Sequence, residues 1–472
     1  MIIGLAARAR HCAASALLGV ALLPLPPALA ANPDLIVTKF TDGLDGSCDA
    51  DCSLREAVLL ANQTPGASRI VLAAGTYRLS ILPDEDPDPS SEGFIDDDEN
   101  LNGDLDIKGT LTIVGRGMDI TMIDAGGIDR IAEMLPGAAA TFSKLTVRNG
   151  YQALGGSGFD VNVGGTLGLQ SCGVTGNVSF ANISNATGGG IANRGTLSID
   201  ASRIDGNLAA AESRHGFGGG IYNLGSLTVR DARFIRNRAT DEGETSEGGA
   251  LYNEGTADIR RATFENNQVS GSGSGAAILN VRTGTLRIEN STLSGNTNAF
   301  SDQQTAGAIE NGRSLEGATA LARLVNVTIA GNPATGLINR GRISITNSII
   351  AGNGLRFMEP ESNGDDQRDQ NCLNEGAGAQ FSQAGLLRGT DTGNCATTLL
   401  VLNSDSFVTV LHPLALNNWQ SPTFALRKGS VAIDAAVGAC PSSDQRRVIR
   451  PRDGNGDGIA ACDLGSYERT QP

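Results

Sequence analysis

The sequence is poor in aromatic residues and in histidine, and these shortages disfavour several kinds of active site. It contains 1 Trp, 5 Tyr, 13 Phe and 3 His among 472 residues. Saccharide grooves commonly offer aromatic platforms, and histidine is the usual acid–base group near neutral pH. A carbohydrate-active enzyme is therefore disfavoured, and no G-x-S-x-G, H-E-x-x-H, Walker or dinucleotide-binding motif is present.

Positive charge is also in short supply. The 36 Lys and Arg residues are outnumbered by 51 Asp and Glu residues, which gives a formal net charge of −15 and a pI of about 4.7. Such a charge repels phosphate backbones and anionic lipid headgroups, so no nucleic-acid partner is expected. It also disfavours binding of polyuronates, unless calcium bridges the two polyanions.

Long apolar runs are absent after the N-terminus, and residues 1–30 are typical of a cleaved secretory signal. Arg8 and Arg10 supply its positive region, Ala13–Leu25 its apolar region and Ala28-Leu-Ala30 its cleavage motif. The alternative, a transmembrane anchor, is disfavoured because the apolar run is short and interrupted by prolines. We expect an exported protein with no integral membrane span, located outside the cell, at its surface or in the periplasm.

Eight cysteines are present, and seven of them lie after residue 30. Six form three local pairs, Cys48/Cys52, Cys372/Cys395 and Cys440/Cys462. In an exported chain such pairs predict disulfides; zinc is the alternative, but no histidine accompanies them. Cys172 falls in a column of small inward residues, which predicts a buried, unreactive thiol.

A repeat marked by asparagine occupies the middle of the chain. One series consists of Asn162, Asn193, Asn223, Asn253, Asn280, Asn311 and Asn339. A second series consists of Asn177, Asn207, Asn237, Asn267, Asn296, Asn332 and Asn353. Repeats of roughly 20–50 residues are typical of solenoids, in which each unit packs only against its neighbours.

Within each unit, short alternating segments such as Leu227/Val229 predict strands. An apolar residue precedes each second-series Asn by three positions: Val174, Ile204, Phe234, Phe264, Leu293, Ile329 and Ile350. A usually small residue precedes it by five: Cys172, Ser202, Ala232, Ala262, Ser291, Val327 and Ser348. Such columns predict stacked coils of a parallel β-helix, spaced about 4.8 Å apart. The asparagines are expected in tight turns with left-handed backbone, each amide bonding the Asn above and below.

The segment Asp51–Asn62 predicts a short helix that covers the first coil. Ser53 and Glu56 have capping-box spacing. Leu54, Ala57, Val58 and Ala61 form one apolar stripe. Such a helix would shield the open strand edge at the end of the solenoid. A catalytic role for Arg55 and Glu56 is the alternative.

The segments after the second Asn of each unit differ most between units. They include Leu208–Phe217, Arg238–Glu247, Val269–Gly273 and Thr297–Thr305. Variable loops on a rigid solenoid predict a face for ligand recognition. His215 lies in the first of them and is interpreted as a solvated loop residue.

Two acidic segments are candidates for calcium. Asp453-Gly-Asn-Gly-Asp-Gly458 places Asp453, Asn455 and Asp457 at positions 1, 3 and 5 of an EF-type loop, with Asp463 as a later ligand. It predicts a structural calcium ion. The stretch Asp84–Asp106 is either a flexible acidic loop or a second calcium site.

Both ends of the chain resemble known bacterial families. Cys52-Ser-Leu-Arg-Glu-Ala57 matches the motif that names CSLREA-domain proteins, and Ile70–Tyr77 and Gly103–Ile107 are also similar to them. The tail resembles the choice-of-anchor Q region through Ser421–Leu426, Gly429–Asp434, Asp444–Arg446, Arg450-Pro451 and Cys462–Glu468. The resemblance implies a right-handed β-helix of the pectin-lyase type in a surface or secreted protein, without an assigned active site.

The expected fold is therefore all-β: a single-stranded, right-handed parallel β-helix with a short N-terminal capping helix and an irregular, disulfide-fastened C-terminal tail. Its predicted parts are the signal at 1–30, the cap at 31–68, the coils at 69–353 and the choice-of-anchor Q-like cap at 354–472. The expected function is a monomeric binding, adhesin-like or structural module for a glycan or surface protein, without catalytic residues. The alternative is an extracellular lyase or glycoside hydrolase acting on acidic polysaccharide.

Overall fold

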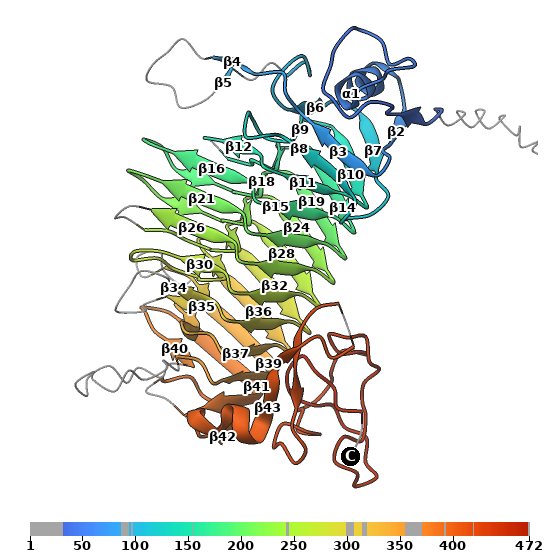
Figure 1. The fold of residues 1–472 in the computed structure, drawn as a ribbon. Coiled ribbons are helices and arrows are strands. Elements are labelled where there is room, and N and C mark those ends of the chain that lie inside the picture. Colours follow the sequence, from blue (N-terminus) through green and yellow to red (C-terminus); the bar gives the residue numbers. More distant parts are fainter. Residues whose placement is uncertain are drawn as a thin grey trace, which may run out of the picture. The chain divides into compact units, whose positions relative to one another are not determined.

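The computed structural model describes residues 32–85, 94–95, 98–153, 155–241, 245–298, 306–313, 319–354, 371–390, 393–418 and 420–470. The predicted signal peptide, Trp419 and much of the acidic stretch lie outside these residues. In the described part, strands of successive coils pair in parallel and wind into a β-helix, which confirms the predicted fold (Figure 1). None of the helices found there is long and apolar enough to cross a membrane.

The strands of the coils form four stacks, and in the middle coils the chain visits all four in order. Stack 1 consists of β6 (Leu105–Ile107), β9 (Ala132–Met134), β13 (Phe159–Val161), β18 (Ile191–Asn193), β23 (Ile221–Asn223), β27 (Leu251–Asn253), β31 (Ile278–Asn280), β35 (Gly307–Asn311), β38 (Thr335–Asn339) and β40 (Cys372–Asn374). Stack 2 consists of β1 (Leu35–Ile36), β2 (Ala67–Val71), β7 (Thr110–Val114), β10 (Ala139–Ser143), β14 (Thr166–Gln170), β19 (Thr196–Asp200), β24 (Ser226–Arg230), β28 (Thr256–Arg260), β32 (Thr285–Glu289) and β36 (Leu321–Val325).

The remaining two stacks complete the coil. Stack 3 consists of β3 (Gly75–Arg78), β8 (Thr121–Asp124), β11 (Thr146–Arg148), β15 (Gly173–Thr175), β20 (Arg203–Asp205), β25 (Arg233–Ile235), β29 (Thr263–Glu265), β33 (Thr292–Ser294), β37 (Thr328–Ala330) and β42 (Leu399–Val401). Stack 4 consists of β12 (Tyr151–Gln152), β16 (Val178–Ala181), β21 (Leu208–Ala211), β26 (Arg238–Asp241), β30 (Gln268–Val269) and β34 (Thr297–Asn298). The long strands β39 (Arg342–Ala351) and β41 (Gln380–Gly389) join stacks 2 and 3. Parallel pairing therefore continues past residue 353, where the sequence suggested that the coils end.

The predicted inward columns lie in the core of the β-helix. The register pairs Ile204 with Phe234 and Phe234 with Phe264, and all three side chains are fully buried. The rings of Phe234 and Phe264 stack with their centroids 4.5 Å apart. Cys172 is buried and free, as predicted, and its burial raises the pKa of the thiol to about 11, so it stays protonated and inert.

The second asparagine series forms a continuous ladder of buried amides. Asn207 Nδ2 donates to Asn237 Oδ1 at 2.9 Å, and Asn237 Nδ2 donates to Asn267 Oδ1 at 3.0 Å. The same bond joins each consecutive pair from Asn177 onward and continues to Asn371 and Asn403, which the sequence did not indicate. The predicted stacking of amides is confirmed.

The first series is also a ladder, with one correction and one extension. Asn193 Nδ2 donates to Asn223 Oδ1 at 2.6 Å, and the chain of bonds ends at Asn374. Asn162 is not part of it, because the register pairs Val161 with Asn193 and the Asn162 amide bonds Glu133 instead. Asn162 therefore lies one residue past the ladder position, which Val161 occupies in this coil.

The expectation of left-handed backbone at the ladder asparagines is wrong for the described residues. Positive φ occurs instead at the position before each second-series Asn, as at Gly206, Arg236 and Asn266. Glycine is required before stack 1: a Cβ on Gly218, whose φ is +64°, would lie 2.2 Å from the carbonyl oxygen of Ile221. The turn and the ladder thus need different residues.

The N-terminal cap matches its prediction. Helix α1 (Leu54–Gln63) begins after Ser53, and the reciprocal bonds of a capping box join Ser53 and Glu56. Arg55 is fully buried, pairs with Asp42 at 3.0 Å and donates to the carbonyl of Gly103 at 2.7 Å. Its guanidinium therefore fastens the cap to the first coils, which is a structural role rather than the alternative catalytic one.

The C-terminal tail follows the last coil and contains little regular structure. Its elements are a 3₁₀ turn (Asn403–Asp405), a π-helical turn (Ser406–Val410) and the antiparallel pair β43 (Leu411–Ala415) and β44 (Thr423–Leu426). The short pairs β4 (Asp84–Glu85) with β5 (Phe94–Ile95) and β17 (Ala186–Thr187) with β22 (Gly216–Phe217) lie in loops between coils. Disulfides join Cys48 to Cys52, Cys372 to Cys395 and Cys440 to Cys462. The predicted pairing of all six cysteines agrees with the structure.

Candidate functional site

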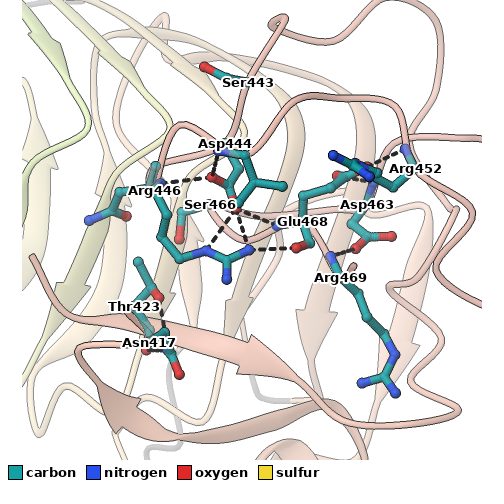
Figure 2. Close-up of polar contacts among 12 residues, drawn as sticks. Asn417, Thr423, Ser443, Asp444, Arg446, Arg452, Asp463, Ser466, Glu468 and Arg469 are labelled. Atoms are coloured by element: carbon teal, nitrogen blue, oxygen red, sulfur yellow. Dashed lines mark hydrogen bonds and ion pairs between the residues drawn. The ribbon is translucent and has the colours of Figure 1, made fainter. Parts of the chain in front are cut away.

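The motif residues of the tail form a buried network of charged side chains (Figure 2). Arg446 donates two hydrogen bonds to Asp444 Oδ2, at 2.9 and 2.7 Å. The Glu468 carboxylate lies 3.3 Å from Arg450 Nε and accepts the amide of Asp463 at 3.0 Å. Arg450, Asp444, Glu468 and Asp463 are all buried, so they hold the tail together and are not open to a ligand.

The same segment attaches the tail to stack 3. Gln445 accepts a hydrogen bond from Thr292 at 2.7 Å and donates one to Thr263 at 2.9 Å. Arg447 pairs with Asp231 at 2.8 Å. Burial acts to raise the pKa of Asp231, but hydrogen bonds from Arg261 and Arg447 outweigh it and hold that pKa below its ordinary value. The tail is thus tied to the coils by charged and neutral contacts.

The predicted calcium loop is an exposed turn closed by its own hydrogen bonds. Asp453 accepts the amides of Gly456 at 2.6 Å and Gly458 at 2.9 Å. Asp463 does not take part in this turn. It is buried, and its carboxylate accepts the backbone amides of Asp434 and Arg469. Among the described side chains, Asp453, Asp457 and Asp463 do not gather their ligand atoms within 4.8 Å. Calcium at this loop stays a prediction.

A different acidic group has closer geometry. In the described part of the chain, the carboxylates of Asp98, Asp106 and Glu133 offer ligand atoms within 4.8 Å of one another. Asp106 and Glu133 are neighbours in stack 1, and both are buried. Protein donors already reach them: the Asn100 amide bonds Asp106 at 2.7 Å, and Arg130 bonds Glu133 at 2.6 Å. Two of the three belong to the acidic stretch of the sequence, whose second calcium site stays a prediction.

A cationic surface lies on the outer face of stack 2. The register aligns Arg230 with Arg260 in one column and Arg287 with Arg323 in the next. Their neighbours along each strand are buried, so these side chains point outward. Arg323 is exposed, and no ion pair joins it or Arg230 to any of the described residues. The same two columns also hold Asp200, Asp258 and Glu289, so the four arginines exceed these carboxylates by one.

This surface and the tail enclose a cleft, which we call the arginine cleft. Its volume is about 340 Å³. It is lined by Arg260, Arg261, Arg287, Glu289, Asn290, Arg323 and Val325 from the coils and by residues 439–443 of the tail. Glu289 is the one carboxylate among these lining residues, and Arg287 pairs with it at 2.7 Å. The cleft therefore presents guanidinium groups in excess of carboxylates.

Ion pairs with carboxylates hold two arginines of the cleft, Arg260 and Arg261, in position. Arg260 donates to the Asp258 carboxylate and Arg261 donates to the Asp231 carboxylate, and each hydrogen bond raises the pKa of its arginine. The ion pairs measure 2.9 Å for Arg260–Asp258 and 2.7 Å for Arg261–Asp231. Arginine forks held in this way suit carboxylate or sulfate groups, which they bind through paired N–H donors.

Sequence reasoning missed this cleft and used only the overall charge. The arginines belong to different coils, and their spacing is irregular, so only the strand register reveals that they are neighbours. Sequence reasoning interpreted His215 as a solvated loop residue and did not place it in a cluster. In the structure it stacks on Phe217 with the ring centroids 5.5 Å apart. His412 lies exposed in β43, and neither histidine lines the cleft.

No protein-family model and no curated protein matches the chain. Among solved structures it is similar to pectate lyase Pel9A, with a TM-score of 0.41 and 12% identity, over 93% of this chain and 97% of that one. It is also similar to the A-module of the Azotobacter vinelandii mannuronan C-5 epimerase AlgE4, with a TM-score of 0.28 and 16% identity, over 73% of this chain and 88% of that one. Because both TM-scores lie below 0.5, function has to be inferred from the chain's own residues. The resemblance to CSLREA-domain and choice-of-anchor Q proteins stays a prediction.

Proposed function

We propose that this chain is an exported, non-catalytic β-helix protein that binds acidic polysaccharide in the arginine cleft. The observation that carries the proposal is the cleft itself: four arginines and one paired carboxylate between stack 2 and the tail. Arg323 is exposed there, without an ion-pair partner among the described residues. Carboxylate or sulfate groups of a glycan would supply that missing partner.

The net charge of the chain disfavours binding of a polyanion, but the local charge of the cleft favours it. The net charge of −15 repels a polyanion as a whole, but this repulsion is screened beyond roughly 8–10 Å at physiological salt. A ligand seated in the cleft meets guanidinium groups at hydrogen-bonding distance. Calcium need not bridge the protein and the glycan at this site.

The chemistry of the cleft favours binding over turnover. General acid–base catalysis needs a group that can exchange a proton near the working pH within reach of the reacting bond. Glu289 is already paired with Arg287. Burial raises the pKa of Glu468 to about 7 and that of Asp463 to about 6, but neither residue lines the cleft.

The test compares Arg323→Ser with Arg238→Ser. Arg238 is a matched control, since it is exposed in β26 of stack 4 and does not line the cleft. Binding of polygalacturonate and of dextran sulfate would be measured by titration calorimetry, with unsubstituted dextran as the neutral probe. We expect Arg323→Ser to weaken polyanion binding by roughly tenfold or more, because a charge-assisted hydrogen bond contributes about 1.5–3 kcal/mol. Arg238→Ser should bind as the unmodified chain does.

Equal affinity in the two variants would overturn the cleft as the binding site. The enzymatic alternative is tested on the same samples by following the ultraviolet absorbance of unsaturated uronide products and the release of reducing ends. Turnover that is lost in a cleft variant would replace the binding proposal by a lyase or hydrolase. Export through residues 1–30 and a structural calcium ion at Asp453, Asn455 and Asp457 remain parts of the proposal.

A further inference from the structure

The few aromatic residues of this chain are not scattered. Phe217 and Tyr252 lie with their ring centroids 4.9 Å apart, and Tyr222 and Tyr252 lie 5.1 Å apart. His215 extends the group by stacking on Phe217. These rings come from a loop, from β23 and from β27, so neighbouring coils bring them together. We call this group the aromatic shelf.

The shelf lies on the outer face of stack 1, not in the core. Tyr222 and Tyr252 are paired in register, and each stands between an inward aliphatic residue and a ladder asparagine. Tyr252 is 2% exposed, while Tyr222 and Phe217 are half-buried. Tyr252 is thus the base of the shelf, and the other two rings form its open surface.

The Tyr222 ring stacks on Tyr252, and its centroid lies 6.3 Å from that of Phe217. In the preceding coil the residue at the same register is Ala192, whose side chain is too small to cover a ring. The Tyr222 hydroxyl makes no hydrogen bond to any of the described residues. Burial and the nearby Glu254 raise the pKa of Tyr222, so the hydroxyl is a neutral donor at ordinary pH.

The rim of the shelf is polar, and its charges are matched. Glu254 accepts the Tyr252 hydroxyl at 2.8 Å and pairs with Arg282 at 3.2 Å. Arg194 pairs with Asp160 at 2.6 Å. Opposite charges therefore neutralise each other here, whereas guanidiniums exceed carboxylates in the arginine cleft. A neutral ligand with many hydroxyl groups matches such a rim.

We propose that the aromatic shelf is a second binding site, which stacks a pyranose ring of an uncharged glycan on the half-buried ring of Tyr222. Aromatic rings offer a flat apolar face to sugar C–H groups, while Glu254, Arg282 and the Tyr222 hydroxyl bond the sugar hydroxyls. The shelf is built partly by Leu208–Phe217, one of the variable loops. The proposal does not rest on the arginine cleft, because it concerns different residues on a different stack.

The test uses neutral hexaoses of glucose, xylose and mannose as probes and the full exported chain. Saturation-transfer NMR detects binding, and titration calorimetry measures affinity. We expect at least one hexaose to bind, with affinity lowered roughly fivefold in Tyr222→Ala and less in Tyr222→Phe, which keeps the ring. Tyr151→Ala is the matched control, since Tyr151 is also a part-exposed ring on a coil strand but lies outside the shelf.

Salt separates the two sites. Binding at the shelf should persist at about 1 M salt and in Arg323→Ser, whereas polyanion binding in the cleft should weaken by roughly tenfold or more under both conditions. Binding of a neutral hexaose that Tyr222→Ala leaves unchanged would overturn the shelf. Absence of binding by every hexaose in the panel, or binding only of nucleic acid or peptide to the rings, would overturn it as well.

Discussion

The coils and the C-terminal tail are both held together by buried polar groups, but of different kinds. The coils use neutral amides: each ladder asparagine bonds the next one, as Asn207 bonds Asn237 at 2.9 Å. The tail uses ionised groups that occur once, such as Arg450 and Glu468 at 3.3 Å. Neutral amides carry no desolvation penalty for charge, whereas buried ions are stable only while every partner is present.

This difference has consequences for stability. The ladder has no proton to gain or lose, so its contribution does not change with pH. Glu468 and Asp463 titrate near neutrality because burial raises their pKa values to about 7 and about 6. The tail should therefore respond to pH while the coils do not.

The largest effect is expected from a charge placed in the core of the coils. Phe234→Asp would bury a carboxylate between the apolar side chains of Ile204 and Phe264. We expect a loss on the order of 4 kcal/mol or more in the free energy of unfolding, measured by urea denaturation. Arg238→Asp, which puts the same charge on the surface, should cost little. Equal midpoints for the two variants would contradict the assignment of Phe234 to the core.

A single ladder amide should matter less than a core charge. Asn237→Ala removes the acceptor of the Asn207 amide groups and the donor to Ile204 O and Asn267 Oδ1. Because these partners stay buried, we expect a loss of about 2–3 kcal/mol. Asn182→Ala, on an exposed side chain, serves as the control. If both alanine variants unfold at the same urea concentration, the ladder does not stabilise the coils.

The pH response of the tail should be of intermediate size. The folded pKa values of Glu468 and Asp463 are raised above their unfolded values near 4. Their contribution to stability is therefore complete below about pH 4 and is lost as pH rises through about 6 to 7. Asp231, whose pKa is lowered, loses its contribution only at lower pH.

Calorimetry at about pH 5 and about pH 8 should thus show a tail transition that is weaker at the higher pH, by on the order of 2 kcal/mol. Glu468→Gln should remove most of this difference. A coil transition that shifts by the same amount would show that the two regions do not differ in the way proposed. A tail transition that is stronger at the higher pH would contradict the direction of the shift.

The smallest effect is expected from calcium at the exposed turn of the tail. Binding through Asp453, Asn455 and Asp457 should stabilise the tail by about 1 kcal/mol at calcium concentrations a few times the Kd. Asp457→Ala should abolish that gain and leave the coil transition unchanged. Identical melting curves with calcium and with a chelator would remove calcium from the description of this protein.

The coils could be predicted because their residues repeat. The inward column through Phe234 and the ladder through Asn237 recur once per coil, so a sequence pattern is also a spatial pattern. The capping box at Ser53 and the local cysteine pairs were predictable for a related reason, since their partners are close in sequence. Asn162 was misassigned because it lies one residue past the ladder position held by Val161, and the spacing of the true ladder residues varies by more than one residue.

The candidate sites could not be predicted, because no local signal marks them. Arg260, Arg287 and Arg323 become neighbours only through the strand register and the return of the tail. The aromatic shelf unites residues that are individually unremarkable in the sequence. The whole chain contains few basic and few aromatic residues, but folding brings several arginines together in the cleft and several aromatic rings together in the shelf.

The asparagine ladder also determines where this scaffold can change length. Consecutive ladder residues are 30 positions apart between Asn177 and Asn207, 36 between Asn296 and Asn332 and 18 between Asn353 and Asn371. The amide bonds stay between 2.8 and 3.1 Å throughout. The bonds at this corner are therefore kept whatever the length of the coil, and the loops between the paired strands can gain or lose residues. Recognition loops can be exchanged on such a scaffold without altering the bonds that hold successive coils together.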